Sequence, residues 1–195
     1  MSVRVTLREH LQTVDQNAQA NEKNFESLKK RMKKKFKECG YPNASKNDTL
    51  VMQYIHMIFK TQDYRCTHWI PVKEGELNGV WNRPHPGYRG WKADYIMYEI
   101  DHIHPVNAGG GEHLQNFQFL SANANEFVKC SLTIEDLLNR VDLSGVLKRR
   151  IARVMKRRER LFATKKWQKF MDKMNKLDPR PVLPTPPVEA ENENG

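Results

Sequence analysis

Residues 98–129 constrain the fold of this chain more than any other segment. Two runs rich in β-formers, 95–101 and 117–120, flank a Gly-rich loop over 106–115. Short runs of this composition predict strands, and the glycines between them predict that the chain turns back. A helix is expected to follow from about 122 to 130, so the segment predicts a strand–loop–strand–helix unit.

Side chains that can bind a metal ion or transfer a proton lie at the ends of these predicted elements. Asp101 and His102 close the first run, and asparagines follow at Asn116, Asn123 and Asn125. Carboxylate and amide oxygens are ligands for a divalent ion, and an imidazole near neutral pH can take a proton from water. Strict strand alternation would direct Asp101 and His102 to opposite faces. We therefore expect the strand to end and turn here, so that the two side chains converge.

The charge of the chain indicates a polyanionic partner. The formal net charge is +10 and the isoelectric point is about 9.6, which favours nucleic acid first and an anionic membrane surface second. No run of eighteen apolar residues is present, so no membrane-spanning helix is expected. The three cysteines form no CxxC pair and the first residues do not resemble a signal peptide. We therefore expect a reducing compartment and a cytoplasmic location.

Helical patterns on both sides of this segment carry most of the positive charge. A helix start near Thr6 is followed by a pattern that runs to about Cys39, and another helix is expected to begin at 45–48. A further helix is expected to start at Thr133, and after a break near 142–145 one long basic helix is expected to run to about Leu177. Lysines crowd the first pattern, and like charges along a helix repel one another. We therefore favour nucleic-acid contact there over a merely solvated face.

The chain divides into four predicted parts. They are basic N-terminal helices over 1–45, a core over 46–142, a basic C-terminal helix over 143–177 and a Pro-rich acidic tail over 178–195 that is expected to be disordered. A loop over 82–91 mixes arginine with aromatic residues, so it is either an ordinary surface loop or a contact for a nucleic-acid strand. Across these parts, the candidate nucleic-acid contacts are Lys29, Lys30, Lys33, Lys34, Arg83, Arg89, Arg149, Arg150, Arg153 and Arg157.

The order of these polar residues resembles that of the HNH, or ββα-metal, nuclease family. The matching residues are D-H-I-H-P at 101–105, the pair Gly109-Gly110, N-F-Q-F-L at 116–120 and A-N-A-N at 122–125. The intervals of 14 residues from His102 to Asn116 and 9 from Asn116 to Asn125 are also typical of the family. The likeness spans about residues 58–130. It implies an α+β fold, with a ββα-metal (HNH) core embedded in mostly α-helical N- and C-terminal extensions.

The resemblance implies a separate role for each of these residues. His102 would be the general base that takes a proton from the attacking water, and Asn116 would support the loop and the histidine. Asp101 and Asn125 would bind one divalent metal ion, Mg²⁺ first and Mn²⁺ second, because both ions favour oxygen ligands. Three further residues are candidates for accessory roles. Glu99 could share the metal's face, with a solvent-exposed or salt-bridge role preferred. His104 could contact phosphate or be structural, and Asn123 is a rival metal ligand whose spacing fits less well.

The chain departs from the family at the positions of two zinc-binding cysteine pairs that many relatives carry. Cys66 has no second cysteine beside it, and the other pair is replaced by Ser121 and Ala124. Four ligands at structural-zinc spacing are absent, so we expect no structural zinc, with apolar packing in its place. The lysine that follows the motif in relatives is also displaced, to Lys129.

The sequence and the resemblance together predict a metal-dependent DNA endonuclease of bacterial or phage origin. One such site would hydrolyse one phosphodiester bond, leaving a 5′-phosphate and a 3′-hydroxyl, so a monomer would nick and a homodimer could cut both strands. The DNA could be duplex, branched or nicked, and no membrane partner is expected. Two alternatives remain open: a non-catalytic nucleic-acid-binding protein on an HNH scaffold, and a nuclease that cleaves RNA.

Overall fold

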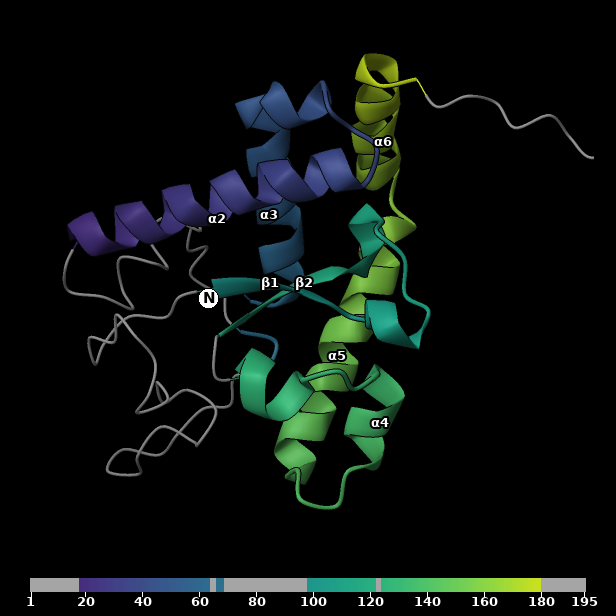
Figure 1. Cartoon of the computed structure of the whole chain (residues 1–195). Coiled ribbons are helices and arrows are strands. Elements are labelled where there is room, and N and C mark those ends of the chain that lie inside the picture. Colours follow the sequence, from purple (N-terminus) through teal and green to yellow (C-terminus); the bar gives the residue numbers. More distant parts are fainter. Residues whose placement is uncertain (1–17, 64–65, 69–97, 122–123, 180–195) are drawn as a thin grey trace, which may run out of the picture.

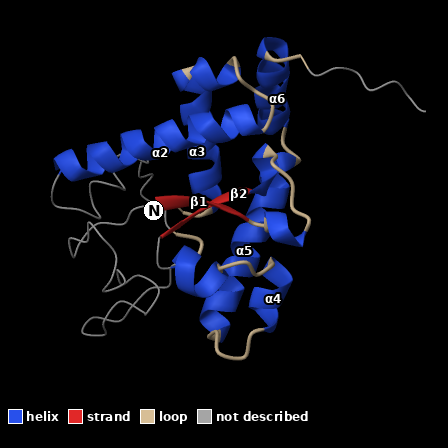
Figure 2. Ribbon diagram, viewed as in Figure 1, coloured by secondary structure: helices blue, strands red, loops and turns tan. Residues whose placement is uncertain are grey.

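The computed structural model describes residues 18–63, 66–68, 98–121 and 124–179 (Figure 1). Helices and a single two-stranded antiparallel sheet are combined in this part of the chain, as expected for an α+β protein (Figure 2). None of the described helices is long and apolar enough to cross a membrane. In chain order the longer elements are α2 (Ala18–Glu38), α3 (Asp48–Thr61), β1 (Tyr98–His102), β2 (Phe117–Ser121), the π-helical η5 (Ala124–Lys129), α4 (Ile134–Asn139), α5 (Gly145–Phe162) and α6 (Lys165–Leu177).

Several predicted features lie outside the described residues. They are the helix start near Thr6, the loop over 82–91 with Arg83 and Arg89, Asn123, and the tail from 180 onward.

The first two described helices form where the apolar spacing predicted them. In α2, Leu28, Met32 and Phe36 are buried at steps of four residues, so they share one face of the helix. The next helix, α3, begins at Asp48, at the end of the segment 45–48 where a helix start is expected. Asn47 is its N-cap, and its side chain accepts a hydrogen bond from the Leu50 amide at 3.1 Å.

The two strands pair in one fixed register. β1 and β2 are antiparallel, with Tyr98 opposite Ser121 and His102 opposite Phe117. The ladder continues one step further, because the Ile103 amide donates to the Asn116 carbonyl at 2.7 Å. The prediction that the strand ends and turns at Asp101 is therefore wrong: pairing continues through His102, and the two side chains keep the alternation of a strand.

One hydrophobic core joins helices of the N-terminal and C-terminal parts to the hairpin. Its buried residues come from α2, α3, both strands and α6, so the N-terminal and C-terminal helices share a core with the hairpin. The Phe59 and Phe119 rings stack with their centroids 4.4 Å apart, which joins α3 to β2. The buried Tyr54 hydroxyl donates to the Leu114 carbonyl at 2.7 Å and fixes the loop three residues before β2 begins at Phe117.

The long C-terminal helix expected over 143–177 is in fact two helices, α5 and α6. α5 ends at Phe162, and Thr164 becomes the N-cap of α6, since its side chain accepts a hydrogen bond from the Trp167 amide at 3.1 Å. The break allows α6 to place Trp167, Phe170 and Met174 in the core beside α3. Before α5, the predicted helix start at Thr133 is confirmed, with a capping box that starts α4.

Candidate functional site

The loop between the strands is closed by one buried side chain, Asn116. Its Oδ1 accepts from the His104 amide at 2.8 Å, and its Nδ2 donates to the carbonyls of His104 and Gly111 at 2.9 and 3.0 Å. Gly110 packs so closely that a Cβ there would lie 1.9 Å from the His104 carbonyl oxygen. The asparagine and the glycine together hold both ends of the loop against the end of β1.

Asp101 lies on the face of β1 that also carries Glu99. Its Oδ2 accepts a hydrogen bond from Gln118, its register partner on β2, at 2.8 Å. The Nζ of Lys129 lies 3.8 Å from the same oxygen, and the Asp101 side chain is 10% exposed. Burial raises the pKa of Asp101, and the charge of Lys129 and the bond from Gln118 oppose that rise.

Asn125 joins this face from the segment that follows β2. Its Nδ2 donates to Glu99 Oε2 at 2.7 Å, so η5 directs the asparagine toward the side of β1 that carries both acids. Two carboxylates and one amide therefore share a face, and oxygen donors of these types suit Mg²⁺ or Mn²⁺. Among the described residues, no three His, Cys, Asp or Glu side chains gather into a metal-binding cluster, so Asn125 is needed to complete any such set.

Lys129 limits how a metal ion could be held there. Its side chain is fully buried, its Nζ has no hydrogen-bond partner within the described chain, and burial lowers its pKa. It places a cationic group against Asp101, whose Oδ2 is therefore already engaged. The donor chemistry of Glu99, Asp101 and Asn125 fits a hard divalent ion, and such an ion would have to share Asp101 with the lysine.

His102 lies on the opposite face of β1, among different neighbours. Its Nε2 is 2.9 Å from Oε1 of Glu112, and its ring centroid is 5.1 Å from that of Phe117. Lys35, on α2, contacts the same carboxylate oxygen at 3.1 Å. Burial lowers the pKa of Lys35, but its bonds to Glu38 and Glu112 outweigh this and raise that pKa overall.

Sequence reasoning missed Glu112 as a site residue. Glu112 is the only acidic residue in the loop over 106–115, directly after three glycines. That isolation is a signal that could have identified it. Its contact with Lys35 could not be found in this way, because the two residues are 77 positions apart.

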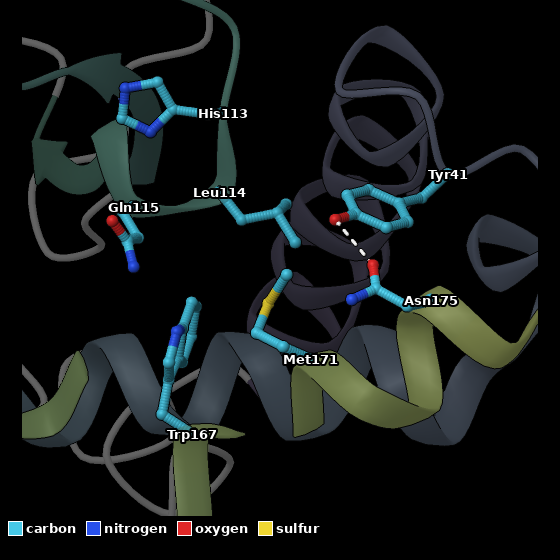
Figure 3. Close-up of a pocket in the computed structure, with 7 residues that line it drawn as sticks. All are labelled: Tyr41, His113, Leu114, Gln115, Trp167, Met171 and Asn175. Atoms are coloured by element: carbon cyan, nitrogen blue, oxygen red, sulfur yellow. Dashed lines mark hydrogen bonds between the residues drawn. The ribbon is translucent and has the colours of Figure 1, made fainter. Parts of the chain in front are cut away.

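The remaining histidines of the loop make other contacts. His104 is exposed, and its Nε2 lies 2.8 Å from the Ala108 carbonyl oxygen, within the loop itself. His113 lines a pocket of about 290 Å³ between the loop and α6, where Leu114, Trp167 and Met171 form apolar walls (Figure 3). This pocket is separate from the side chains of Asp101, His102 and Asn125, which do not line it.

Cys66, Ser121 and Ala124 lie together and are joined by two hydrogen bonds. The Cys66 Sγ accepts a hydrogen bond from the Ser121 amide at 3.2 Å, and the Ser121 hydroxyl accepts one from the Ala124 amide at 3.3 Å. Cys66 and Ala124 are both part of the hydrophobic core. Burial raises the pKa of the Cys66 thiol, which favours its uncharged form.

The candidate nucleic-acid contacts differ sharply in their surroundings. Lys29 and Lys33 form ion pairs with Asp48, and Lys34 lies 3.7 Å from Glu38, while Lys30 is exposed.

On α5, Arg149 and Arg153 are exposed, but Arg157 contacts Asp63. Arg150 is buried, and its guanidinium donates to the Gln62 carbonyl at 2.6 Å. Arg150 therefore stabilises the fold and is not available as a surface contact, contrary to the sequence-based expectation.

Comparisons with known proteins add no relative. No family model, no curated protein and no solved structure matches this chain. The likeness to the HNH family therefore rests on the residues of this chain alone.

Proposed function

We propose that this protein is a metal-dependent DNA endonuclease that hydrolyses phosphodiester bonds at a single ββα-metal site. One observation carries the proposal: η5 brings Asn125 to the face of β1 that carries Glu99 and Asp101, within a strand–loop–strand–helix unit. The products would be a 5′-phosphate and a 3′-hydroxyl, and one site would nick one strand. The strongly basic chain, with its net charge of +10, supports a nucleic-acid substrate.

The proposed roles follow from the chemistry of each contact. Asp101 and Asn125 would hold a divalent ion, with Glu99 as a further oxygen donor. When bound, such an ion would stabilise negative charge on the leaving oxygen. His102 would accept a proton from water. Because a carboxylate can only accept, the contact with Glu112 requires the proton of a neutral His102 to reside on Nε2, which leaves Nδ1 as the basic nitrogen.

The two faces of β1 restrict where a substrate phosphate can lie. Asp101 and His102 are adjacent but project to opposite sides. A phosphate that contacts both must therefore lie across the edge of β1 near its C-terminal end. In the described part of the chain β1 pairs with β2 alone, which leaves its other edge without a third strand.

The rival function is that of a nucleic-acid-binding protein without nuclease activity. The position of Lys129 favours it, because a buried cationic side chain 3.8 Å from Asp101 Oδ2 already compensates part of the carboxylate charge. Both functions predict affinity for nucleic acid, and they differ in cleavage alone.

Relaxation of supercoiled plasmid separates the two functions. The protein is incubated with plasmid in Mg²⁺, in Mn²⁺ and in EDTA, and binding is followed in parallel by gel shift. We expect open-circular product with either metal and none with EDTA. A gel shift without conversion in any metal would support the binding protein instead. A labelled RNA of matched sequence, added to the same reactions, tests whether RNA is also cleaved.

A further inference from the structure

The helix α5 has two faces of different chemistry. Its buried face consists of Leu147, Ile151 and Val154, together with two buried arginines. Its exposed face carries a row of cations at steps of four, three and four residues, a spacing that places them on one side of a helix, opposite the buried face. We call this row the α5 stripe: Arg149, Arg153, Lys156 and Arg160.

Among the acids that the structure describes, none pairs with the α5 stripe. Within the described residues, none of its four side chains forms an ion pair, and Glu159 is the sole acid of α5. The nearby Asp63 is engaged by Arg150 and Arg157, which lie outside the stripe. The stripe therefore presents positive charge that is free to meet an external anion.

Several lysines of α2 are paired with acids, unlike the cations of the α5 stripe, although the α2 lysines are more densely spaced in the sequence. Lys29 contacts Glu26 and Asp48, Lys33 contacts Asp48, and Lys35 contacts both Glu38 and Glu112. A phosphate would have to compete with these carboxylates. Lys30, Lys34 and Lys37 are exposed on one face of α2, but this row has three cations where the α5 stripe has four, and Glu38 lies 3.7 Å from Lys34.

The length and rigidity of the α5 stripe indicate what it binds. From Arg149 to Arg160 it extends about 16 Å, at about 1.5 Å per residue, which exceeds the size of a small anion. Duplex DNA carries a negative charge about every 1.7 Å of its axis, and arginine forks bind phosphate in a bidentate manner. The stripe is also fixed relative to the hairpin, because Arg158 donates to the Gln115 carbonyl at 3.0 Å.

We infer that the α5 stripe, and not α2, is the principal surface that binds the phosphodiester backbone of duplex DNA. This inference rests on the proposed function in taking DNA as the partner, but it does not require cleavage. The α5 stripe would hold the duplex against the rigid unit that α5 forms with the two strands and the loop between them.

Two variants with equal loss of charge test the inference. One replaces Arg149, Arg153, Lys156 and Arg160 with Gln, and the control replaces Lys30, Lys33, Lys34 and Lys37 with Gln. Binding to a labelled 20-base-pair duplex is measured by fluorescence anisotropy in EDTA, between 50 and 200 mM salt, after circular dichroism has shown that both variants are folded. We expect the α5 variant to lower the slope of log K against log salt by about 3 to 4, since each phosphate contact contributes about 0.9.

The control variant should keep more than half of the wild-type slope. The inference is overturned if the α5 variant retains the wild-type slope of log K against log salt. It is also overturned if the α2 control variant lowers that slope as much as the α5 variant does. A wild-type protein that binds anionic phospholipid vesicles or duplex RNA through the stripe and fails to bind duplex DNA overturns it as well. Because binding is measured in EDTA, absence of plasmid cleavage would refute the proposed nuclease and leave this result unaffected.

Discussion

The Glu112 carboxylate lies 2.9 Å from Nε2 of His102 and joins the loop after β1 to that strand. A carboxylate in this position orients an imidazole and selects which of its nitrogens carries the proton. Lys35 contacts the same carboxylate oxygen at 3.1 Å, so a residue of α2 takes part in positioning His102.

Replacing Glu112 should therefore affect turnover more than substrate binding. We expect Glu112→Ala to lower kcat for plasmid nicking by about 10- to 100-fold, the range known for residues that orient metal-binding histidines, with little change in KM. Glu112→Gln should retain much of the activity, because its amide oxygen still accepts the Nε2 proton. The ¹⁵N shifts of neutral His102 should report Nε2–H in the wild type. A predominant Nδ1–H form would contradict this account.

Lys129 should be coupled to metal binding through Asp101. Removing one partner of a buried ion pair typically costs about 3 kcal/mol, so Lys129→Met should lower stability in EDTA by about that amount. Mn²⁺ should then raise the Tm of Lys129→Met more than that of the wild type, because the ion replaces the lost positive charge. Lys60→Met, on the exposed surface of α3, is the control. Equal Tm shifts in all three proteins would show that Asp101 does not bind the ion.

Two neighbouring glycines should respond differently to substitution. A Cβ at position 110 would lie 1.9 Å from the His104 carbonyl oxygen, whereas one at 111 would meet His113 Cδ2 at 3.4 Å. Gly110→Ala should therefore cost about 1 to 3 kcal/mol of stability as the backbone shifts, and Gly111→Ala much less. Urea unfolding of both variants measures the difference. Equal costs would mean that the loop does not pack as described.

Stability should fall in acid because of His68. The ring is fully buried, neither ring nitrogen has a hydrogen-bond partner among the described residues, and burial lowers the pKa of His68 to about 3. Between pH 6.5 and 3 the unfolded chain binds a proton that the folded protein does not. His68 therefore reduces the free energy of unfolding by up to about 1.4 kcal/mol for each pH unit lost in that window.

The measurement is urea unfolding at pH 7.0, 6.0 and 5.0 for the wild type, His68→Gln and His113→Gln. His68→Gln should flatten the decline, and His113→Gln, at an exposed position, should leave it unchanged. Parallel declines in all three proteins would rule out the buried neutral histidine as the cause.

Local patterns were sufficient to predict the hairpin and the helices that flank it. Strand alternation, the glycines of the loop and the capping residues Asn47 and Thr133 act over a few residues, so the sequence reveals them directly. The break at Thr164 was missed because helix-forming residues continue on both sides of it. A threonine that can cap the next helix was the only local signal.

Long-range contacts account for what the sequence could not show. Arg149 and Arg150 are adjacent and chemically identical, yet one is exposed and the other is buried against the Gln62 carbonyl. In the same way, nothing local to Lys129 indicates that it lies beside Asp101. Side-chain roles of this kind depend on which elements pack together, and that is decided by the whole core.

We propose that His102 activates water for phosphodiester hydrolysis. The most direct test is the single-turnover rate of plasmid nicking by the wild type, His102→Ala and the loop control His113→Ala, all in Mg²⁺ with protein in excess. Since a positioned general base typically contributes about 10²- to 10⁴-fold, His102→Ala should be slower by that factor and His113→Ala should remain near the wild type. Equal nicking rates for the wild type and His102→Ala would contradict the account.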